Sequence, residues 1–151
     1  MNLYSIALFF HVVGAVLLFV LLTVEGVGLR VGLGSARLNR ILGPISAVMI
    51  LVPGFYMVAT TWGWKSWIVV GITAYVAIAV LGAITGVAVM RGRMSPQTAA
   101  FSWLARVGLA LGVLFDMTVK PDSLISVLAV VAGLLVGAAV GLLTRREVKT
   151  A

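Results

Sequence analysis

The sequence predicts an all-α fold, a polytopic transmembrane helix bundle of five spans in one domain, residues 1–151. Three observations lead to this prediction. Hydrophobic residues make up 62% of the chain and charged residues 10%, whereas soluble domains carry about 25% charged residues. Five apolar runs are each long enough to cross a bilayer, which takes about 20 residues. Most lysines and arginines fall in the gaps between these runs, as is typical of membrane proteins.

The five predicted spans differ in polarity. Four of them contain no Asp, Glu, Lys or Arg, whereas the fourth contains Arg106 and Asp116. For this fourth run we favour a full span over a re-entrant or tilted helix. The predicted spans are residues 3–24, 41–61, 66–90, 101–119 and 123–143.

Prolines indicate several of the expected helix ends. We expect Pro44 in the first turn of the second span, where its missing N–H costs little. Pro53 lies in the middle of that span and should kink it, which membrane helices tolerate. Ser95 and Pro96 form a plausible start for the fourth span. Pro121 should end it, because the residue before a proline avoids the helical region.

The basic residues predict an orientation. With five spans, eight of them fall on one side of the membrane and two on the other. By the positive-inside rule, the N-terminus is outside and the C-terminus inside. The net charge of +7 is therefore no sign of a nucleic-acid partner. The two groups are Arg30, Arg37, Arg40, Arg91, Arg93, Arg145, Arg146 and Lys149 against Lys65 and Lys120.

Several kinds of chemistry are excluded by composition. The chain contains no cysteine, which excludes disulfides, zinc–thiolate sites, Cys-ligated clusters and thiol catalysis. We find neither a nucleotide-binding loop nor a soluble catalytic motif. These observations favour a protein that is not an enzyme and whose immediate partner is the lipid bilayer.

Four ionisable side chains interrupt the apolar sequence: His11, Glu25, Arg106 and Asp116. A charged group costs about 2.5–3.5 kcal/mol at the centre of a membrane helix, so these are the candidates for an intramembrane polar site. The first and fourth spans run in opposite directions, which brings His11 level with Asp116 and Glu25 level with Arg106. If the two spans are neighbours, a rise of about 1.5 Å per residue leaves both pairs within side-chain reach.

Each pair has more than one interpretation. Glu25 and Arg106 most simply form a structural ion pair, although Arg106 could instead extend toward the headgroups. His11 could hydrogen-bond a neighbouring helix, or it could be a ligand whose imidazole Asp116 orients or supplies with a proton.

Three residues of the same half of the bundle complete the candidate ligand site: Met117, Met57 and Tyr56. Imidazole with thioether suits Cu(I), or haem iron with methionine as second axial ligand. Methionine is also an ordinary filler of apolar cores. The expected cofactor is therefore copper or haem, if there is one.

Glycines spaced by four residues predict close helix packing. This packing could lie within the monomer, in a homodimer, or against a larger membrane complex. The glycines concerned are Gly82 and Gly86, Gly108 and Gly112, and Gly133, Gly137 and Gly141.

Four segments carry a resemblance to known proteins: LYSIALFFHVVGAVLLF, RLNRILGPISAVMILVPGFYMV, WGWKSWIVVGITAYV and FDMTVKPD. They resemble a family of small bacterial membrane proteins of unknown function, distantly similar to the copper-resistance D membrane domain and the J-type protoporphyrinogen oxidase. The resemblance implies a helical bundle in a bacterial plasma (inner) membrane, with His11 near a metal path or as a haem ligand. The oxidase's further histidines are absent here.

The sequence thus predicts a small membrane protein with a polar intramembrane pocket that binds or transports a metal, haem or proton. One alternative is a non-catalytic accessory subunit that packs onto a larger membrane complex. Another is a haem-dependent membrane oxidoreductase.

Overall fold

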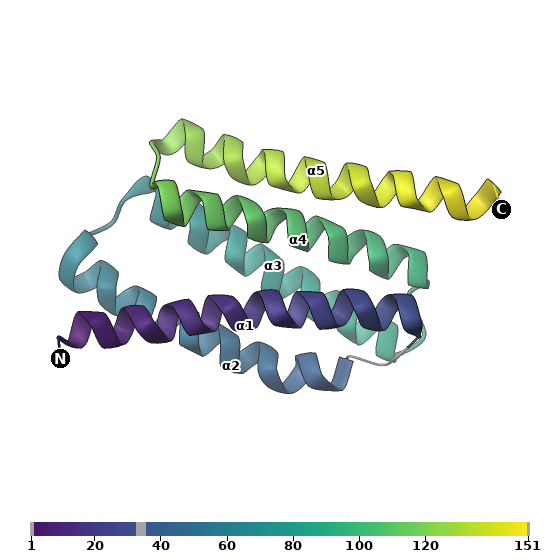
Figure 1. Ribbon diagram of the computed structural model, residues 1–151, viewed down its shortest axis with the longest axis horizontal. Helices are drawn as coiled ribbons and strands as arrows, with labels where there is room; N and C mark the ends of the chain where they lie inside the picture. Colours follow the sequence, from purple (N-terminus) through teal and green to yellow (C-terminus); the bar gives the residue numbers. More distant parts are fainter. Residues whose placement is uncertain (1, 33–35, 151) are drawn as a thin grey trace. The chain divides into compact units, whose positions relative to one another are not determined.

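The computed structural model describes residues 2–32 and 36–150, and this part of the chain is helical with no strand. Each of the five α-helices is long and apolar enough to cross a membrane, which confirms the all-α prediction and supports a multi-pass membrane protein. The elements are α1 (Leu3–Val31), α2 (Ala36–Met57), the π-helix η1 (Val58–Trp62), α3 (Ser66–Met90), α4 (Pro96–Val119) and α5 (Ser123–Thr150) (Figure 1).

The contacts divide the chain into two compact units, which we describe separately. Unit 1 is Met1–Lys65, in which α1 and α2 pack side by side and η1 continues α2. Unit 2 is Ser66–Ala151, in which α4 packs against both α3 and α5 (Figure 1). The single domain expected from the sequence stays a prediction.

Four of the five helices extend beyond the predicted spans. The first helix continues to Val31, the second begins at Ala36, the fourth begins at Pro96 instead of residue 101, and the fifth continues to Thr150. Hydropathy detects only the part of a helix inside the hydrocarbon, whereas backbone hydrogen bonds continue until a cap ends them. Gly32 ends α1 with a φ of 70°, a left-handed conformation that glycine adopts readily.

Ser95 and Pro96 start α4, as the sequence predicts. The Ser95 side chain accepts a hydrogen bond from the backbone N–H of Thr98, and Pro96 occupies the first turn. The helix ends at Val119, two residues before Pro121. The fourth run is thus one continuous helix of 24 residues, long enough for a full span.

The position predicted for Pro44 is wrong, because α2 begins at Ala36 and Pro44 lies inside it. The predicted start at residue 41 excluded Arg37 and Arg40, whose charges hydropathy rejects although arginine is a good helix former. Pro53 also lies inside α2, as expected, and the π-helix η1 follows it.

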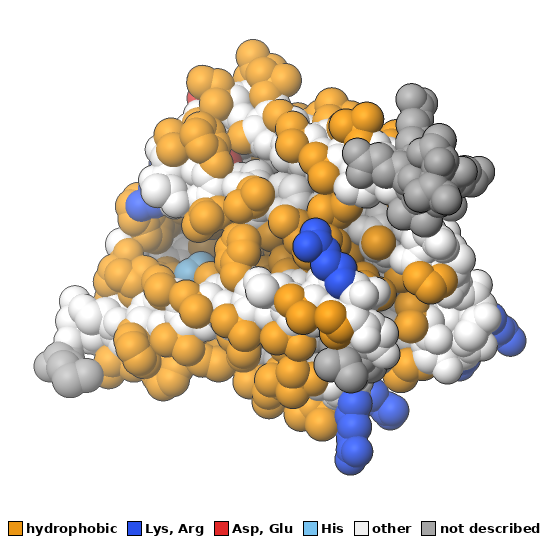
Figure 2. Space-filling view, turned by 45° about the vertical axis from the view of Figure 1, so that its right-hand side comes forward, with side chains coloured by type: hydrophobic (Ala, Val, Ile, Leu, Met, Phe, Trp, Pro, Cys, Tyr) orange, Lys and Arg blue, Asp and Glu red, His pale blue; other side chains and the backbone are white. Residues whose placement is uncertain are grey.

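Large apolar side chains are exposed on the helices of both units. Phe9 is 62% exposed, Val52 62% and Val136 63%. The face seen in Figure 2 is covered mainly by hydrophobic side chains. A soluble monomer rarely exposes apolar area on this scale, whereas lipid solvates it without cost.

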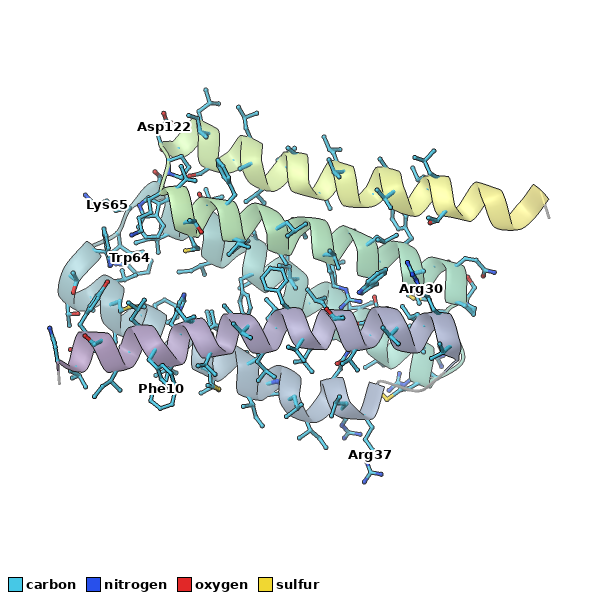
Figure 3. All side chains as sticks on the ribbon, viewed as in Figure 1. Phe10, Arg30, Arg37, Trp64, Lys65 and Asp122 are labelled. Atoms are coloured by element: carbon cyan, nitrogen blue, oxygen red, sulfur yellow. The ribbon has the colours of Figure 1, made fainter. Side chains whose placement is uncertain are left out.

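Basic side chains occur beyond the apolar parts of the helices. Arg30 and Arg37 lie at the same end of unit 1, where α1 leads into α2 (Figure 3). The structure does not describe the side chains of Arg145, Arg146 and Lys149. The orientation across the membrane therefore stays a prediction.

Candidate functional site

His11 joins α1 to α2 in unit 1. Its Nδ1 atom lies 2.7 Å from the carbonyl oxygen of Ile50. Because a carbonyl only accepts, Nδ1 donates its proton in this hydrogen bond. Gly54 makes the approach possible, since a Cβ there would lie 3.2 Å from His11 Nδ1.

A second hydrogen bond between the same helices runs in the reverse direction. The Ser46 hydroxyl on α2 donates to the Gly14 carbonyl on α1 at 2.9 Å, and Ser46 is only 1% exposed. A Cβ on Gly14 would lie 2.9 Å from the backbone nitrogen of Ile50. Close approach at glycine, combined with hydrogen bonds between helices, is how membrane helices associate.

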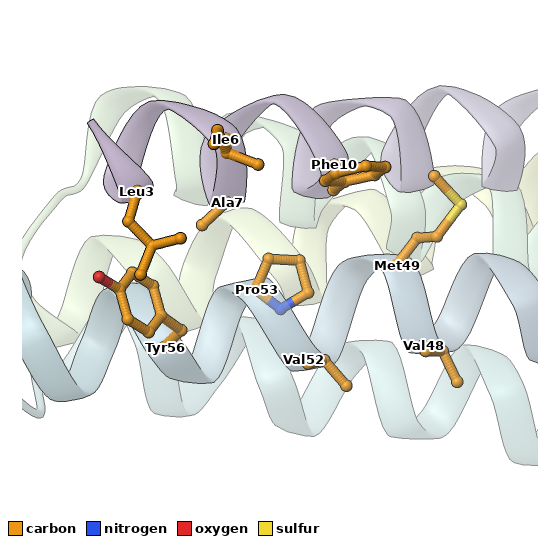
Figure 4. Close-up of a pocket in the computed structure, with 9 residues that line it drawn as sticks. All are labelled: Leu3, Ile6, Ala7, Phe10, Val48, Met49, Val52, Pro53 and Tyr56. Carbon is orange, nitrogen blue, oxygen red and sulfur yellow. The ribbon is translucent and has the colours of Figure 1, made fainter. Parts of the chain in front are cut away.

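The other two candidates of unit 1 are Tyr56 and Met57. Tyr56 lines an apolar groove of about 400 Å³ between α1 and α2, where it lies beside Leu3 (Figure 4). His11 is not part of the groove lining. Met57 is 7% exposed and shares a face of α2 with Ile50 and Gly54, about 4.5 Å of helix rise beyond Gly54.

Asp116 is the most deeply buried ionisable group among the described residues, at 0% exposed. Neither of its carboxyl oxygens has a hydrogen-bond partner within the described part of the chain. The hydroxyl of Ser126, on α5 and also 0% exposed, faces this carboxyl but lies outside hydrogen-bonding geometry. Three buried polar oxygens thus share one site in unit 2, and none of them has a hydrogen-bond partner among the described residues.

Gly71 of α3 forms a third wall of the Asp116 site. A Cβ at this position would lie 3.3 Å from Asp116 Oδ2 and would overlap the terminal methyl group of Met117. Met117 therefore lies beside the carboxyl, as part of the apolar wall of the site. Its thioether is a soft donor beside Asp116 within unit 2.

Arg106 lies further along α4 and is 4% exposed. Its Nη1 atom would be 3.1 Å from a Cβ on Gly82, so the guanidinium faces α3 at a position where glycine leaves space. One turn further on, the hydroxyls of Thr85 and Ser102 are 2.6 Å apart and link α3 to α4.

The pairings expected from the sequence cross the two units and stay predictions. Glu25 and His11 belong to unit 1, whereas Arg106 and Asp116 belong to unit 2. Within unit 1, the amide of Asn39 donates to Glu25 Oε2 at 3.1 Å.

Most of the four-spaced glycines lie at the contact between α4 and α5. A Cβ on Gly108 would collide with the carbonyl oxygen of Gly133, and one on Gly137 with that of Leu104. Gly112 lies against Val130 in the same way. Gly141 faces Phe101 and Gly82 faces Arg106, whereas no atom lies within 4 Å of a Cβ built on Gly86.

Sequence reasoning missed the small residues around Asp116 and around His11. They are Ser126 and Gly71 near Asp116, and Gly54, Ser46 and Gly14 at the contact that His11 makes. Their only signal is a small or polar residue in an apolar run, which many membrane helices carry for packing alone. Among the described residues, no three His, Asp or Glu side chains come together in a way that could hold a metal ion.

No family model, curated protein or solved structure is significantly similar to this chain.

Proposed function

We propose that the chain is a small multi-pass protein of the bacterial inner membrane, with its N-terminus outside, and that its function depends on reversible proton binding by Asp116. The observation that carries this proposal is the complete burial of a carboxyl group with no hydrogen-bond partner among the described residues. Ionisable groups within membrane spans are rare and typical of proton relays and ion paths.

The ligand that suits this site is a proton. When the Asp116 carboxyl carries a proton, it can donate a hydrogen bond to Ser126 Oγ. This bond would give a partner to Ser126 Oγ and to one carboxyl oxygen, neither of which has one in the present geometry. A buried carboxylate without a proton or counter-ion is far more expensive. Hard metal cations take six or more oxygen ligands, whereas the carboxyl of Asp116 and the hydroxyl of Ser126 offer three.

We expect Asp116 to react with a lipid-soluble carbodiimide, a reagent that modifies protonated carboxyl groups in apolar surroundings. The chain has only four acidic residues, so intact-mass measurement and peptide mapping can assign the product. Asp116→Asn should abolish labelling within the membrane. The matched variant Asp122→Asn, which changes an exposed carboxyl at the start of α5, should leave that labelling unchanged. Equal labelling of wild type and Asp116→Asn would refute the proposal.

A second candidate function is binding of haem or copper by His11. The Nδ1–H bond to the Ile50 carbonyl favours it, because ligating histidines commonly donate their other ring N–H to such an acceptor. The resemblance to the copper-resistance D domain and to the J-type oxidase points to the same residue. The accessory-subunit alternative has less support, since the glycines of α4 and α5 pack against each other.

For this second function we expect the protein, purified in mild detergent, to carry a haem absorption band or bound copper that His11→Ala removes. The variant should remain folded, because hydrogen bonds between membrane helices contribute only about 0.6 kcal/mol on average. Absorption spectra, elemental analysis and circular dichroism measure these properties. Tyr56→Phe is the matched control, since Tyr56 lines a groove to which His11 does not contribute. A colourless, metal-free wild type would remove this candidate.

A further inference from the structure

Trp67 and Lys120 meet about one helical turn beyond the Asp116 site. The Lys120 ammonium lies 5.9 Å from the centroid of the Trp67 ring, within cation–π range. Trp67 precedes Gly71 by four residues, so both lie on one side of α3, and Lys120 is the cap that follows α4, four residues after Asp116. Because Gly71 lies against Asp116, the Trp67–Lys120 contact lies beyond the site, on the side of the α4–α5 turn.

The backbone holds Lys120 in this position. Its φ is 53°, in the left-handed region of the backbone that residues other than glycine and asparagine seldom adopt. Its N–H donates to the carbonyl oxygen of Asp116 at 2.9 Å, and α5 begins three residues later. Such a conformation persists only where the surrounding structure imposes it, often at functional sites.

In the opposite direction, buried side chains follow the Asp116 site along the α3–α4 contact. Gly71 and Gly82 share one face of α3, and they lie against Asp116 and Arg106 respectively. Between these levels α3 carries Ile78, which is 3% exposed. The buried side chain of Arg106 then occupies the level of Gly82.

We propose that Asp116 exchanges its proton only with the end of unit 2 where α4 meets α5, through a gate formed by Trp67 and Lys120. The proposal deepens the proposed function and rests on it. Opening the gate requires the indole and the ammonium to separate, which leaves the backbone of both helices in place. Unit 2 then contains a one-sided proton site, and α3 and α4 form no continuous channel.

The absence of cysteine allows a direct test of access. Asp116→Cys is prepared in sealed membrane vesicles, and a membrane-impermeant thiol reagent is added to one side at a time. Asp122→Cys reports the side of the α4–α5 turn, and Arg91→Cys reports the opposite end of unit 2, since both residues are exposed. We expect the cysteine at position 116 to react slowly, and only from the side that modifies Asp122→Cys.

Removal of the gate should accelerate this reaction. Trp67→Ala in the Asp116→Cys background should raise the rate about two- to fivefold, the factor expected when one exposed cation–π contact is lost. Lys120→Ala should act in the same direction. Trp64→Ala is the matched control, because Trp64 is 68% exposed and its ring lies against Phe55 in unit 1.

Three results would overturn the gate: reaction from the Arg91→Cys side, an unchanged rate in Trp67→Ala, or no reaction from either side. If Asp116→Cys fails to fold, Ser126→Cys reports the same site from α5. This experiment measures access without requiring a bound proton. A failed carbodiimide reaction with normal one-sided thiol access would therefore count against the proposed function alone.

Discussion

Gly108→Ala should destabilise unit 2 by more than about 3 kcal/mol, because overpacking that cannot relax exceeds the usual range of about 1–3 kcal/mol. The added Cβ would collide with the carbonyl oxygen of Gly133 and lie 3.1 Å from the Cα of Gly137. These obstacles are backbone atoms of α5, so no side-chain rotation can relieve them. The helices would have to separate, and with them the walls around Asp116. The midpoint of thermal unfolding in detergent measures the effect.

Gly86→Ala is the matched control for this prediction. It also adds one methyl group to a helical glycine, but no atom lies within 4 Å of the new Cβ. It should be neutral or stabilise the protein by about 0.5–1 kcal/mol, since alanine loses less conformational entropy in a helix. Equal midpoints for the two variants would contradict the observed α4–α5 packing. A folded Gly108→Ala monomer derived from a wild-type dimer would instead favour the homodimer alternative.

The five helices could be predicted because the length and polarity of an apolar run are local properties of the chain. Their ends could not be predicted in the same way. The start of α4 at Pro96 depends on capping, which the Ser95-Pro96 pair indicated, but the continuation of α1 to Val31 leaves no apolar signal. Helix ends beyond the hydrocarbon depend on backbone hydrogen bonds that hydropathy does not measure.

The candidate sites likewise contain some residues that could be predicted from the sequence and others that could not. Asp116 and Arg106 stand out in the sequence because a charge in a membrane span is costly. Ser126 and Gly71 do not, since serine and glycine are common in membrane helices and acquire a role only when another helix lies against them. Which face of α5 meets α4 depends on the packing of two helices, and a single sequence contains no measurement of it. The acids and bases were therefore predictable, but their surroundings were not.

Gly14→Ala should be the most damaging single change in unit 1. The new Cβ would lie 2.9 Å from the backbone nitrogen of Ile50 and from the carbonyl carbon of Met49, so α1 and α2 must move apart. That movement also lengthens both hydrogen bonds between the helices, from His11 to Ile50 and from Ser46 to Gly14. We expect a loss of about 1–3 kcal/mol, measured as a lower midpoint of thermal unfolding.

Two further variants separate packing from hydrogen bonding at this contact. Gly43→Ala, whose Cβ meets nothing within 4 Å, should not destabilise the protein. Ser46→Ala removes the hydroxyl that donates to Gly14 and should cost about 0.6 kcal/mol, the average for such bonds in membrane proteins. The order of damage should therefore be Gly14→Ala, Ser46→Ala, then Gly43→Ala. If Ser46→Ala proved as harmful as Gly14→Ala, the hydrogen bonds would dominate the contact, and glycine at position 14 would serve mainly to expose its carbonyl to Ser46.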